Sequence, residues 1–414
     1  MRIMIANDLY GPSSAAGVAV GSARALVERG HEVHFVATVR EPAEARRFDE
    51  DGVHVHLIHA PAYDLRWRAW RSCWNARAIR GLREVLDEVK PDVAHFHNVH
   101  IFLSYRAFKV AADAGAAVVL SVHDVMPFCF QKMFCFISDE HRVDGPPISF
   151  KAPMPKCIPC ARFRYNPFRN PWIRHHVRRY VKRVLAVSDE MGRALRDNGY
   201  DVDIHANGLD PRRAASAAQG AAFRAVHGIE ERKVVLYGGR LDHRKGAEHL
   251  IRAMATVRER VPNAALLVVG SSHGGYEDRM LEFAAELGLG DSIFTTGWID
   301  QEEMATAYAA ADVICTPSLI FESFGLINAE GMLAGKPAVS SFFGGTKDVV
   351  EHGVTGFHVN PLHVDDLAER LATLLEDDAL RERMGEAARA RVLERFHQEK
   401  QAEHLERLYA ELGS

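Results

Sequence analysis

The sequence has no apolar run near the roughly 20 residues that a membrane-spanning helix requires, which excludes a protein built of such helices. The first residues, MRIMIANDLYG, hold an apolar stretch that is too short for a secretory signal. Short-period repeats and low-complexity segments are also missing, so we exclude fibrous and repeat architectures. We therefore expect a cytoplasmic globular protein.

Cysteine is scarce, with six in 414 residues, and the cytosol keeps thiols reduced. Four of them share an irregular segment at about 125–170: Cys129, Cys135, Cys157 and Cys160. The second pair, in KCIPC, has the spacing of a zinc knuckle, and a bound metal could replace the core that the segment lacks. We predict a structural zinc site, with a redox pair, a disulfide or plain packing as the open alternatives.

Acidic residues are unevenly distributed. Residues 1–200 hold 29 Lys and Arg against 21 Asp and Glu, whereas residues 201–414 hold 22 against 34. Two basic aromatic stretches, 66–83 and 161–183, account for part of the first excess. They predict an anionic or membrane-linked acceptor, and a place at the membrane periphery, rather than nucleic acid. Solvated cations over a buried Trp face are the alternative interpretation.

Short apolar strands alternate with amphipathic helices along the chain, which predicts parallel sheets with helices on both faces. The length suits two domains. We expect a first Rossmann-like domain at 1–205, carrying the cysteine segment, and a second at 206–385. A last helix within 386–414 could cross back to the first domain. Ligands of such sheets lie at the carboxyl ends of the strands.

Two motifs of the second domain carry chemistry suited to an anion. In YGGRLDHRKG, Gly239 allows close approach of the backbone, and Arg240 and Lys245 would face a diphosphate. In FESFGLINAE, Glu322 precedes a helix that we expect to start near Phe324 with Ser323 as its cap, and Glu330 lies two turns further on. Surface turns and ion pairs are the alternative interpretation of each motif alone.

Taken in order, these motifs resemble the retaining glycosyltransferases of family 4, with the GT-B architecture of two Rossmann-like domains facing across a crevice. The most specific part is E-S-F-G-L-x-x-x-E followed by M-x-A-G-x-P, at residues 322–337. Supporting parts are G-R-L with K-G at 239–246, N-G-x-D at 207–210, R-G-H-E-V at 29–33, P-D-V-x-H-x-H at 91–97, and His123-Asp124 after a strand.

The resemblance implies a role for each matching residue. Arg240 and Lys245 would neutralise the diphosphate of a nucleotide sugar, and Glu330 would accept from the ribose hydroxyls. The remaining donor contacts would come from Glu322 and from the backbone of Gly17, Gly239, Ser323, Phe324, Gly325 and Leu326. His123 would lie near the anomeric centre, and no catalytic metal is expected. A UDP-sugar is favoured as the donor, with a GDP-sugar as the alternative.

The sequence departs from the family pattern in three places. Ala16-Gly17 stands where paired glycines are common, Gly331 and Leu333 replace alanines, and Lys347-Asp348 replaces a typical Pro-Glu. The last change puts the role of that carboxylate in doubt. None of the three removes a group that we expect to bear charge in the reaction.

Some motifs have less specific interpretations. Asp201-Val202-Asp203 could hold a metal, but a solvated turn fits its position better. Among the closely spaced histidines, we expect His95 and His97 to flank a strand end, one facing the core and one facing the crevice. A dinucleotide dehydrogenase is disfavoured because the first loop lacks G-x-G-x-x-G.

The sequence therefore predicts a glycosyltransferase that keeps the anomeric configuration of a transferred sugar. A sucrose- or trehalose-type synthase or a phosphorylase on the same fold is an alternative. A protein that binds nucleotide sugars without turnover is another.

Overall fold

The computed structural model describes residues 1–11, 14–129, 131, 133–271 and 275–413. The chain divides into two compact units, each described here by itself. Unit 1 comprises Met1–Met133, Ser149–Gly208 and Gln398–Ser414, and unit 2 comprises Phe134–Ile148 and Leu209–His397. The cysteine segment is therefore shared: residues 134–148 belong to unit 2, although the chain on both sides of them belongs to unit 1.

Unit 1 is built on a sheet of eight strands within the described residues, in the order β3-β4-β2-β1-β5-β6-β7-β8. The pairs are parallel except β3 with β4. The strands are β1 (Arg2–Ala6), β2 (Glu32–Val39), β3 (Arg46–Glu50), β4 (Val53–His59), β5 (Val93–Phe96), β6 (Ala117–Val122), β7 (Arg183–Ala186) and β8 (Asp203–Ile204).

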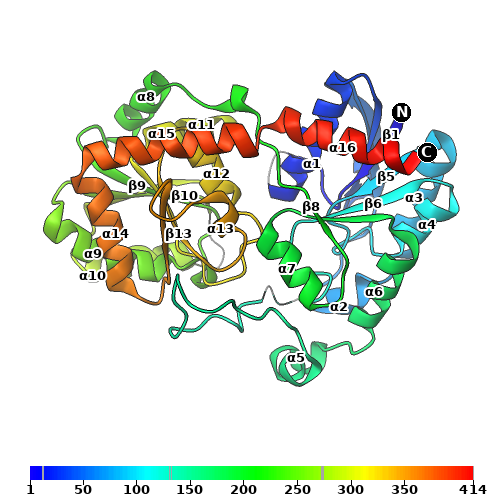
Figure 1. Ribbon diagram of the computed structural model, residues 1–414, viewed down its shortest axis with the longest axis horizontal. Helices are drawn as coiled ribbons and strands as arrows, with labels where there is room; N and C mark the ends of the chain where they lie inside the picture. The colour runs from blue at the N-terminus through cyan, green and yellow to red at the C-terminus, as the bar shows by residue number, and fades with distance from the viewer. Residues whose placement is uncertain (12–13, 130, 132, 272–274, 414) are drawn as a thin grey trace. The chain divides into compact units, whose positions relative to one another are not determined.

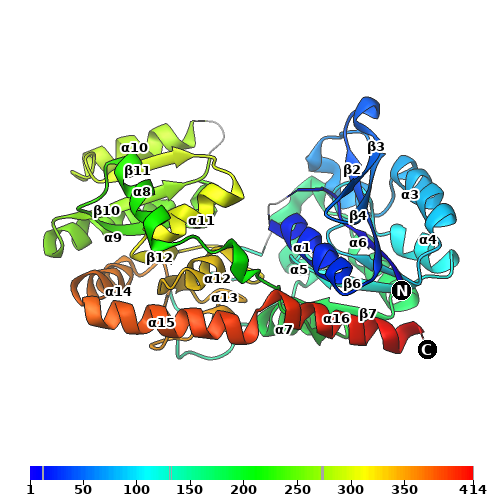
Figure 2. The same ribbon diagram turned by 90° about the horizontal axis from the view of Figure 1, so that it is seen from above.

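Helices cover both faces of this sheet. They are α1 (Ser14–Glu28), α2 (Arg68–Arg71), α3 (Ala76–Val89), α4 (Ala107–Asp113), α5 (Met154–Ala161), α6 (Arg169–Tyr180), α7 (Asp189–Asp197) and α16 (Gln398–Gly413). Figure 2 shows α1 and α16 on one side of the sheet and α3 and α4 on the other. The core joins apolar residues of β1 and β2 to α1 and to Leu405, Leu408 and Tyr409 of α16.

Unit 2 has a sheet of six parallel strands in its described part, in the order β11-β10-β9-β12-β13-β14. The strands are β9 (Lys233–Gly238), β10 (Ala264–Val269), β11 (Ile293–Gly297), β12 (Val313–Thr316), β13 (Ala338–Ser341) and β14 (Gly356–Val359). Every residue of β10, AALLVV, is buried. Such continuous apolar runs are typical of parallel strands that are covered on both faces.

The helices of unit 2 again lie on both faces of the sheet (Figure 1). They are α8 (Ala217–His227), α9 (Ala247–Arg260), α10 (Tyr276–Glu286), α11 (Gln301–Ala310), α12 (Leu326–Leu333), α13 (Thr346–Val349), α14 (Val364–Glu376) and α15 (Asp378–Arg395). Two doubly wound α/β units are what the alternating pattern predicted, and this prediction is confirmed. The strand order reverses beside β9, between β10 and β12, and ligands of open sheets bind outside the strand ends at such a point.

Side-chain bonds attach residues 134–148 to the rest of unit 2. The Asn360 side chain donates to the carbonyl oxygens of Ser138 at 2.9 Å and His141 at 3.1 Å. The Phe136 ring packs edge-on against Phe343, with centroids 5.9 Å apart. Asn360 and Phe343 are both buried, so residues 134–148 form part of the packed interior of unit 2.

Candidate donor site and histidine cluster

The loops that follow β9 and β12 meet in unit 2 through a charged pair. The Lys245 ammonium, beyond the end of β9, forms an ion pair with the Glu322 carboxylate, beyond the end of β12. Ser318 Oγ donates to the same oxygen, Glu322 Oε1, at 2.5 Å. Both partners of the ion pair are mostly buried, with side-chain exposures of 28% and 18%. The structure thus brings together two of the residues that the motifs selected.

Two glycines allow close packing here, Gly246 between the two loops and Gly325 between the second loop and the start of α13. Gly246 has φ +74°, and a Cβ built on it would lie 1.8 Å from the carbonyl oxygen of Pro317. Gly325 has φ +92°, and its Cβ would lie 2.9 Å from Thr346 Cγ2. A side chain at either position would combine backbone strain with a steric clash. The lysine-bearing and glutamate-bearing loops therefore depend on glycine.

The predicted start of α12 is wrong by two residues. The helix begins at Leu326 with Gly325 as its N-cap, so the N-cap residue is not Ser323. Phe324 is 2% exposed and packs edge-on against Phe396, with centroids 5.2 Å apart. The N-cap is thus a left-handed glycine. The first N–H groups of a helix have no intrahelical acceptor and can bind an anion.

Asn328, in the first turn of α12, was missed by sequence reasoning. It is fully buried, and its Oδ1 accepts a hydrogen bond from Thr316 Oγ1 at 2.9 Å. Among the described residues, its Nδ2 has no hydrogen-bond partner. Asn328 lines a pocket together with Lys245, Glu322 and Gly325. The available signal was an amide inside the otherwise apolar run GLINA, where it needs a partner.

Glu330 lies further along α12, away from the ion pair. Its Oε2 accepts a hydrogen bond from the Tyr308 hydroxyl at 2.7 Å. Burial raises the pKa of the Glu330 carboxyl, and this rise is opposed by the Tyr308 hydrogen bond and by the charge of Arg213. Tyr308 holds the carboxylate in one orientation. The second oxygen can then accept from a ligand hydroxyl.

The other predicted donor residues occupy separate positions. Arg240 is exposed in the loop after β9, and the N–H of Gly239 donates to the Val269 carbonyl at 2.8 Å. Gly17, predicted to lie in a loop of the first domain, is instead inside α1, which already begins at Ser14. The helix starts earlier because the run SAAGVAV is rich in alanine, which favours helix.

His123 of unit 1 follows β6 and contacts another histidine. Its Nε2 lies 2.7 Å from Nδ1 of His97, which follows β5, and the two rings stack with centroids 4.9 Å apart. Burial lowers the pKa of His123 to about 4 and lowers the pKa of His97 well below its ordinary value. Both imidazoles are therefore neutral at pH 7, and one of them donates the shared hydrogen bond.

The histidine contacts continue into the core of unit 1. The His97 ring packs against His95 at 4.5 Å between centroids. His95 Nδ1 lies 2.5 Å from the Tyr409 hydroxyl, and its Nε2 lies 2.8 Å from Ser121 Oγ. The prediction that one of His95 and His97 faces a crevice is wrong for the side chains, because their exposures are 0% and 3%. Ring stacking and hydrogen bonds to other side chains make their burial possible.

A buried carboxylate near the strand ends of unit 1 was also missed. Asp8, just after β1, is 1% exposed and accepts backbone hydrogen bonds from Ile101, Phe102 and Leu103 at 2.7 to 2.8 Å. Burial raises the pKa of its carboxyl, and the charge of His100 and the three N–H groups lower it. Asp8 thereby fixes the loop that follows β5 and carries His97. A single Asp after a strand gave little signal in sequence.

The predicted zinc site finds no support. Among the described residues, no group of three or more His, Cys, Asp or Glu side chains comes together in a way that could hold a metal ion. Cys135 lies in unit 2, whereas Cys129, Cys157 and Cys160 lie in unit 1, the last two within the helix α5. The two cysteines of the CxxC motif thus lie in one short helix.

Comparison with known proteins identifies the two halves of the chain. Residues 17–213 match the family described as Glycosyltransferase Family 4, and residues 221–391 match Glycosyl transferases group 1. The chain belongs to glycosyltransferase family 4. Related proteins include a D-inositol 3-phosphate glycosyltransferase of Kribbella flavida, which is 36% identical over 45% of this chain and 46% of the relative.

A second relative is a GDP-mannose-dependent phosphatidylinositol monomannoside mannosyltransferase of Mycolicibacterium smegmatis. It is 34% identical over 46% of this chain and 49% of the relative. An uncharacterised glycosyltransferase of Methanocaldococcus jannaschii is 34% identical over 42% of this chain and 44% of the relative. The matches thus span about half the length of these relatives.

Solved structures show the GT-B fold over nearly the whole chain. Sucrose-phosphate synthase from Thermosynechococcus elongatus superposes with a TM-score of 0.78 at 21% identity, covering 99% of this chain and 98% of that one. HepE of Anabaena, solved with UDP and glucose, gives 0.73 at 19%, covering 99% and 100%. At these identities the likeness establishes the fold alone.

In the described part of this chain, no helix is both long and apolar enough to cross a membrane.

Proposed function

We propose that the protein transfers a sugar from a nucleotide-diphosphate sugar to an acceptor hydroxyl with retention of the anomeric configuration. The observation that carries the proposal is the meeting of Lys245 and Glu322 beside the N-terminus of α12, whose N-cap is Gly325. A cation beside the N-terminus of a helix suits an anion. A diphosphate is the leaving group that needs both.

Lys245 and the first turn of α12 stabilise the negative charge that develops on the departing diphosphate. Arg240, exposed in the neighbouring loop, adds a second cation when the donor is bound. Fixed charges and N–H dipoles aimed at a developing charge are the largest source of rate enhancement in many enzymes. This set supplies the charge stabilisation that a divalent metal provides elsewhere, so the proposed reaction needs no catalytic metal.

Glu322 and Glu330 bind the two ends of the donor. Glu322, whose Oε1 is held by Ser318 and Lys245, is positioned to accept from hydroxyls of the transferred sugar. Glu330, oriented by Tyr308, accepts from the ribose hydroxyls. A hydroxyl donating to a carboxylate makes a charge-assisted hydrogen bond, which is stronger than a neutral one. UDP is the favoured carrier, and GDP is the alternative.

His123 contributes a neutral imidazole to the transferred sugar. Its pKa near 4 keeps it uncharged at pH 7, so it exchanges hydrogen bonds without repelling a developing positive charge at the anomeric carbon. Because no side chain is proposed as a covalent nucleophile, we favour a front-side displacement. In that reaction the phosphate oxygen of the departing diphosphate takes the acceptor proton while the new glycosidic bond forms.

The first test is thermal unfolding of the protein against UDP, GDP, dTDP, ADP and NAD. A ligand at about 100 times its dissociation constant adds about 2.7 kcal/mol to the stability of the native state, which raises the midpoint by a few degrees. We expect a shift with UDP that Lys245→Ala reduces and Arg383→Gln leaves unchanged, since Arg383 is an exposed cation on α15. A shift with NAD alone would overturn the proposal.

Activity is then tested with the matching nucleotide sugar and a panel of anionic and lipid-linked acceptors. Release of the nucleoside diphosphate measures the rate, and NMR of the product reports the anomeric configuration. An inverted product would refute the retaining mechanism and leave donor binding intact. Product formed equally well with and without a chelator is the expected result for a metal-independent enzyme.

A further inference from the structure

Two segments of unit 1 contain cations and no carboxylate. Residues 65–83 hold six arginines, and residues 149–188 hold ten lysines and arginines, whereas neither segment contains Asp or Glu. Both belong to unit 1. The donor chemistry of unit 2 uses none of these residues. Such an excess of one sign over a surface attracts an anionic partner.

The same segments expose large apolar side chains. Leu65, Trp67 and Trp70 are 52%, 52% and 48% exposed, and Phe163 and Phe168 are 79% and 75% exposed. Single exposed apolar side chains are ordinary, but a group of them indicates an interaction site. Removing them from water would provide binding energy that a purely charged surface lacks.

Hydrogen bonds show that the two segments are neighbours in the fold. Asn166 Nδ2 donates to the Ala69 carbonyl at 3.2 Å, and Arg169 Nε donates to Ser72 Oγ at 3.3 Å. The stretch that carries Trp67 and Trp70 therefore lies against the stretch that carries Phe163 and Phe168. Both of these neighbouring stretches carry exposed aromatic side chains.

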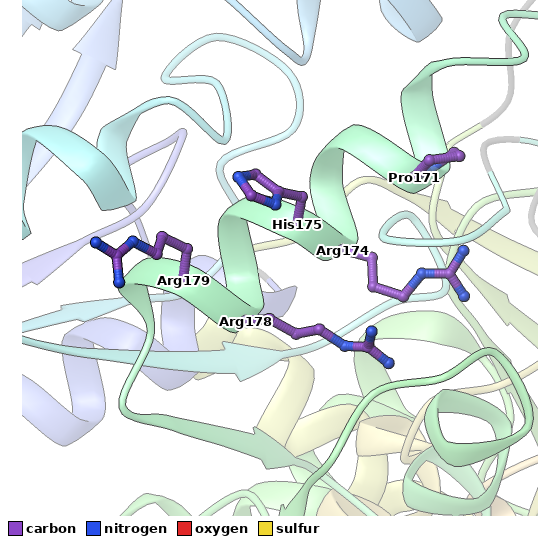
Figure 3. Close-up of a pocket in the computed structure, with 5 residues that line it drawn as sticks. All are labelled: Pro171, Arg174, His175, Arg178 and Arg179. Carbon is purple, nitrogen blue, oxygen red and sulfur yellow. The ribbon is translucent and has the colours of Figure 1, made fainter.

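Helix α6 extends this region with cations. Counting from Phe168, the residues at i+3, i+7, i+10 and i+11 share one helix face and are all exposed: Pro171, His175, Arg178 and Arg179. The opposite face is buried, with Arg169, Ile173, His176 and Val177. Together with Arg174, the exposed face forms a pocket. Figure 3 shows Arg174 and Arg178 extending from one side of the helix and His175 and Arg179 from the other.

We propose that this surface, made of Leu65, Trp67, Trp70, Phe163, Phe168, His175, Arg178 and Arg179 and called the basic aromatic face, docks unit 1 onto an anionic lipid bilayer. Trp and Phe insert at the level of the headgroups, while the guanidinium groups bind lipid phosphates. The orientation brings the enzyme to acceptors that are embedded in the bilayer.

Aliphatic side chains favour a bilayer over a nucleic acid as the partner. The two basic segments also expose aliphatic side chains: Leu65 in the first, and Met154 and Ile158 of α5 in the second, which are 54% and 46% exposed. These side chains can insert among acyl chains, whereas nucleic acids are bound through stacking on flat rings and through phosphate contacts. The mixture of Trp, Phe, aliphatic and Arg side chains is that of an interfacial membrane surface.

Flotation of the full-length protein with lipid vesicles tests the proposal. Vesicles of phosphatidylcholine alone are compared with vesicles that also contain phosphatidylglycerol, at low and high salt. We expect binding to the anionic vesicles only, weakened by salt. The triple variant F163A/F168A/R179Q should lower the partition coefficient by about tenfold or more. The control W298A/R383Q, which removes an exposed Trp and an exposed Arg of unit 2, should leave it unchanged.

Other outcomes would overturn the proposal. These are no binding to anionic vesicles, equal binding to neutral ones, or equal partition of the triple variant and the parent protein. Binding to a single-stranded oligonucleotide that competes with vesicles would instead assign the face to nucleic acid. A UDP-induced thermal shift, measured without lipid, shows that each variant is folded. It also separates a failure of docking from a failure of the proposed donor site.

Discussion

The polar centres of the two units differ in their charges. In unit 2 the ends of β9 and β12 carry an ion pair, Lys245 with Glu322, beside a helix N-terminus. In unit 1 the ends of β5 and β6 carry stacked imidazoles, His97 and His123, which burial keeps neutral. The centre of unit 2 thus presents an ion pair, and the centre of unit 1 presents neutral hydrogen-bonding groups.

The difference suits the two units to different parts of the proposed reaction. A diphosphate is bound by cations and N–H groups, and unit 2 supplies them. A sugar is neutral, and its anomeric carbon gains positive charge during transfer, so a nearby imidazolium would oppose the reaction. On the proposed function, the neutral histidines of unit 1 suit the sugar and the charged pair of unit 2 suits the leaving group.

Removal of the charge in unit 2 should have the largest effect. For Lys245→Ala we expect kcat/KM to fall by about 10²- to 10³-fold, as for other preorganised charge-stabilising groups. Glu322 would also lose its ion-pair partner. Steady-state release of the nucleoside diphosphate measures the rate, with Arg383→Gln as the matched control. If kcat/KM of Lys245→Ala fell by less than a few-fold, Lys245 would not stabilise the leaving group, and the proposed difference between the two units would be wrong.

Acid should destabilise unit 1 through its histidines. Burial lowers the pKa of His123 to about 4 and that of His205, which directly follows β8, to about 3, whereas the unfolded value is near 6.5. Between pH 6.5 and 4 the unfolded chain therefore binds more protons, and the free energy of unfolding falls as pH falls. We expect a loss on the order of a few kcal/mol across this range.

Denaturant titrations at several pH values measure this loss. The variant His205→Gln removes one titrating group, so its stability should depend less on pH than that of the parent protein. If the two pH dependences were parallel, His205 would not be a source of the acid sensitivity.

Disruption of the Tyr308–Glu330 contact should weaken donor binding more than it slows the chemistry. In Tyr308→Phe the carboxylate loses the donor that orients it, and we expect KM for the nucleotide sugar to rise about tenfold at nearly constant kcat, the effect of one lost charge-assisted hydrogen bond. Initial rates over a range of donor concentrations separate the two parameters. An equal fall of kcat at unchanged KM would contradict a role for Glu330 in ground-state binding.

The smallest effect is expected from substitutions of His97, which lies within hydrogen-bond distance of His123. His97→Gln retains a side chain that can donate to His123, whereas His97→Leu does not. We therefore expect kcat of the leucine variant to be several-fold lower than that of the glutamine variant. The pH dependence of kcat is the informative measurement, since a freed His123 titrates at a different pH. Identical pH profiles for both variants would show that His97 contributes packing alone.

The fold could be predicted from the sequence because apolar strands and amphipathic helices follow simple periods. Strand β3, RRFDE, was missed, since an edge strand with charged residues has no apolar alternation. The motifs selected Lys245 and Glu322, which the structure joins in an ion pair, and their part in ligand binding stays a prediction. The N-cap predicted at Ser323 is instead Gly325. A glycine with positive φ can start a helix without any side-chain signal.

Long-range partners could not be predicted at all. Nothing near His95 in the sequence indicates that Tyr409 bonds to it, and nothing near Asp8 indicates three N–H donors at residues 101–103. The buried Nδ2 of Asn328 likewise becomes visible only once β12 and α12 are placed together. Side chains whose partners are distant in sequence have no local pattern.

The interleaved order of the two units has a consequence for biosynthesis. The core of unit 1 contains Leu405, Leu408 and Tyr409, so it cannot close until residues 398–414 have been made, after all of unit 2. The apolar surface of unit 1 that these residues cover is therefore left uncovered until they have been synthesised, whereas unit 2, which includes residues 134–148, is complete before then.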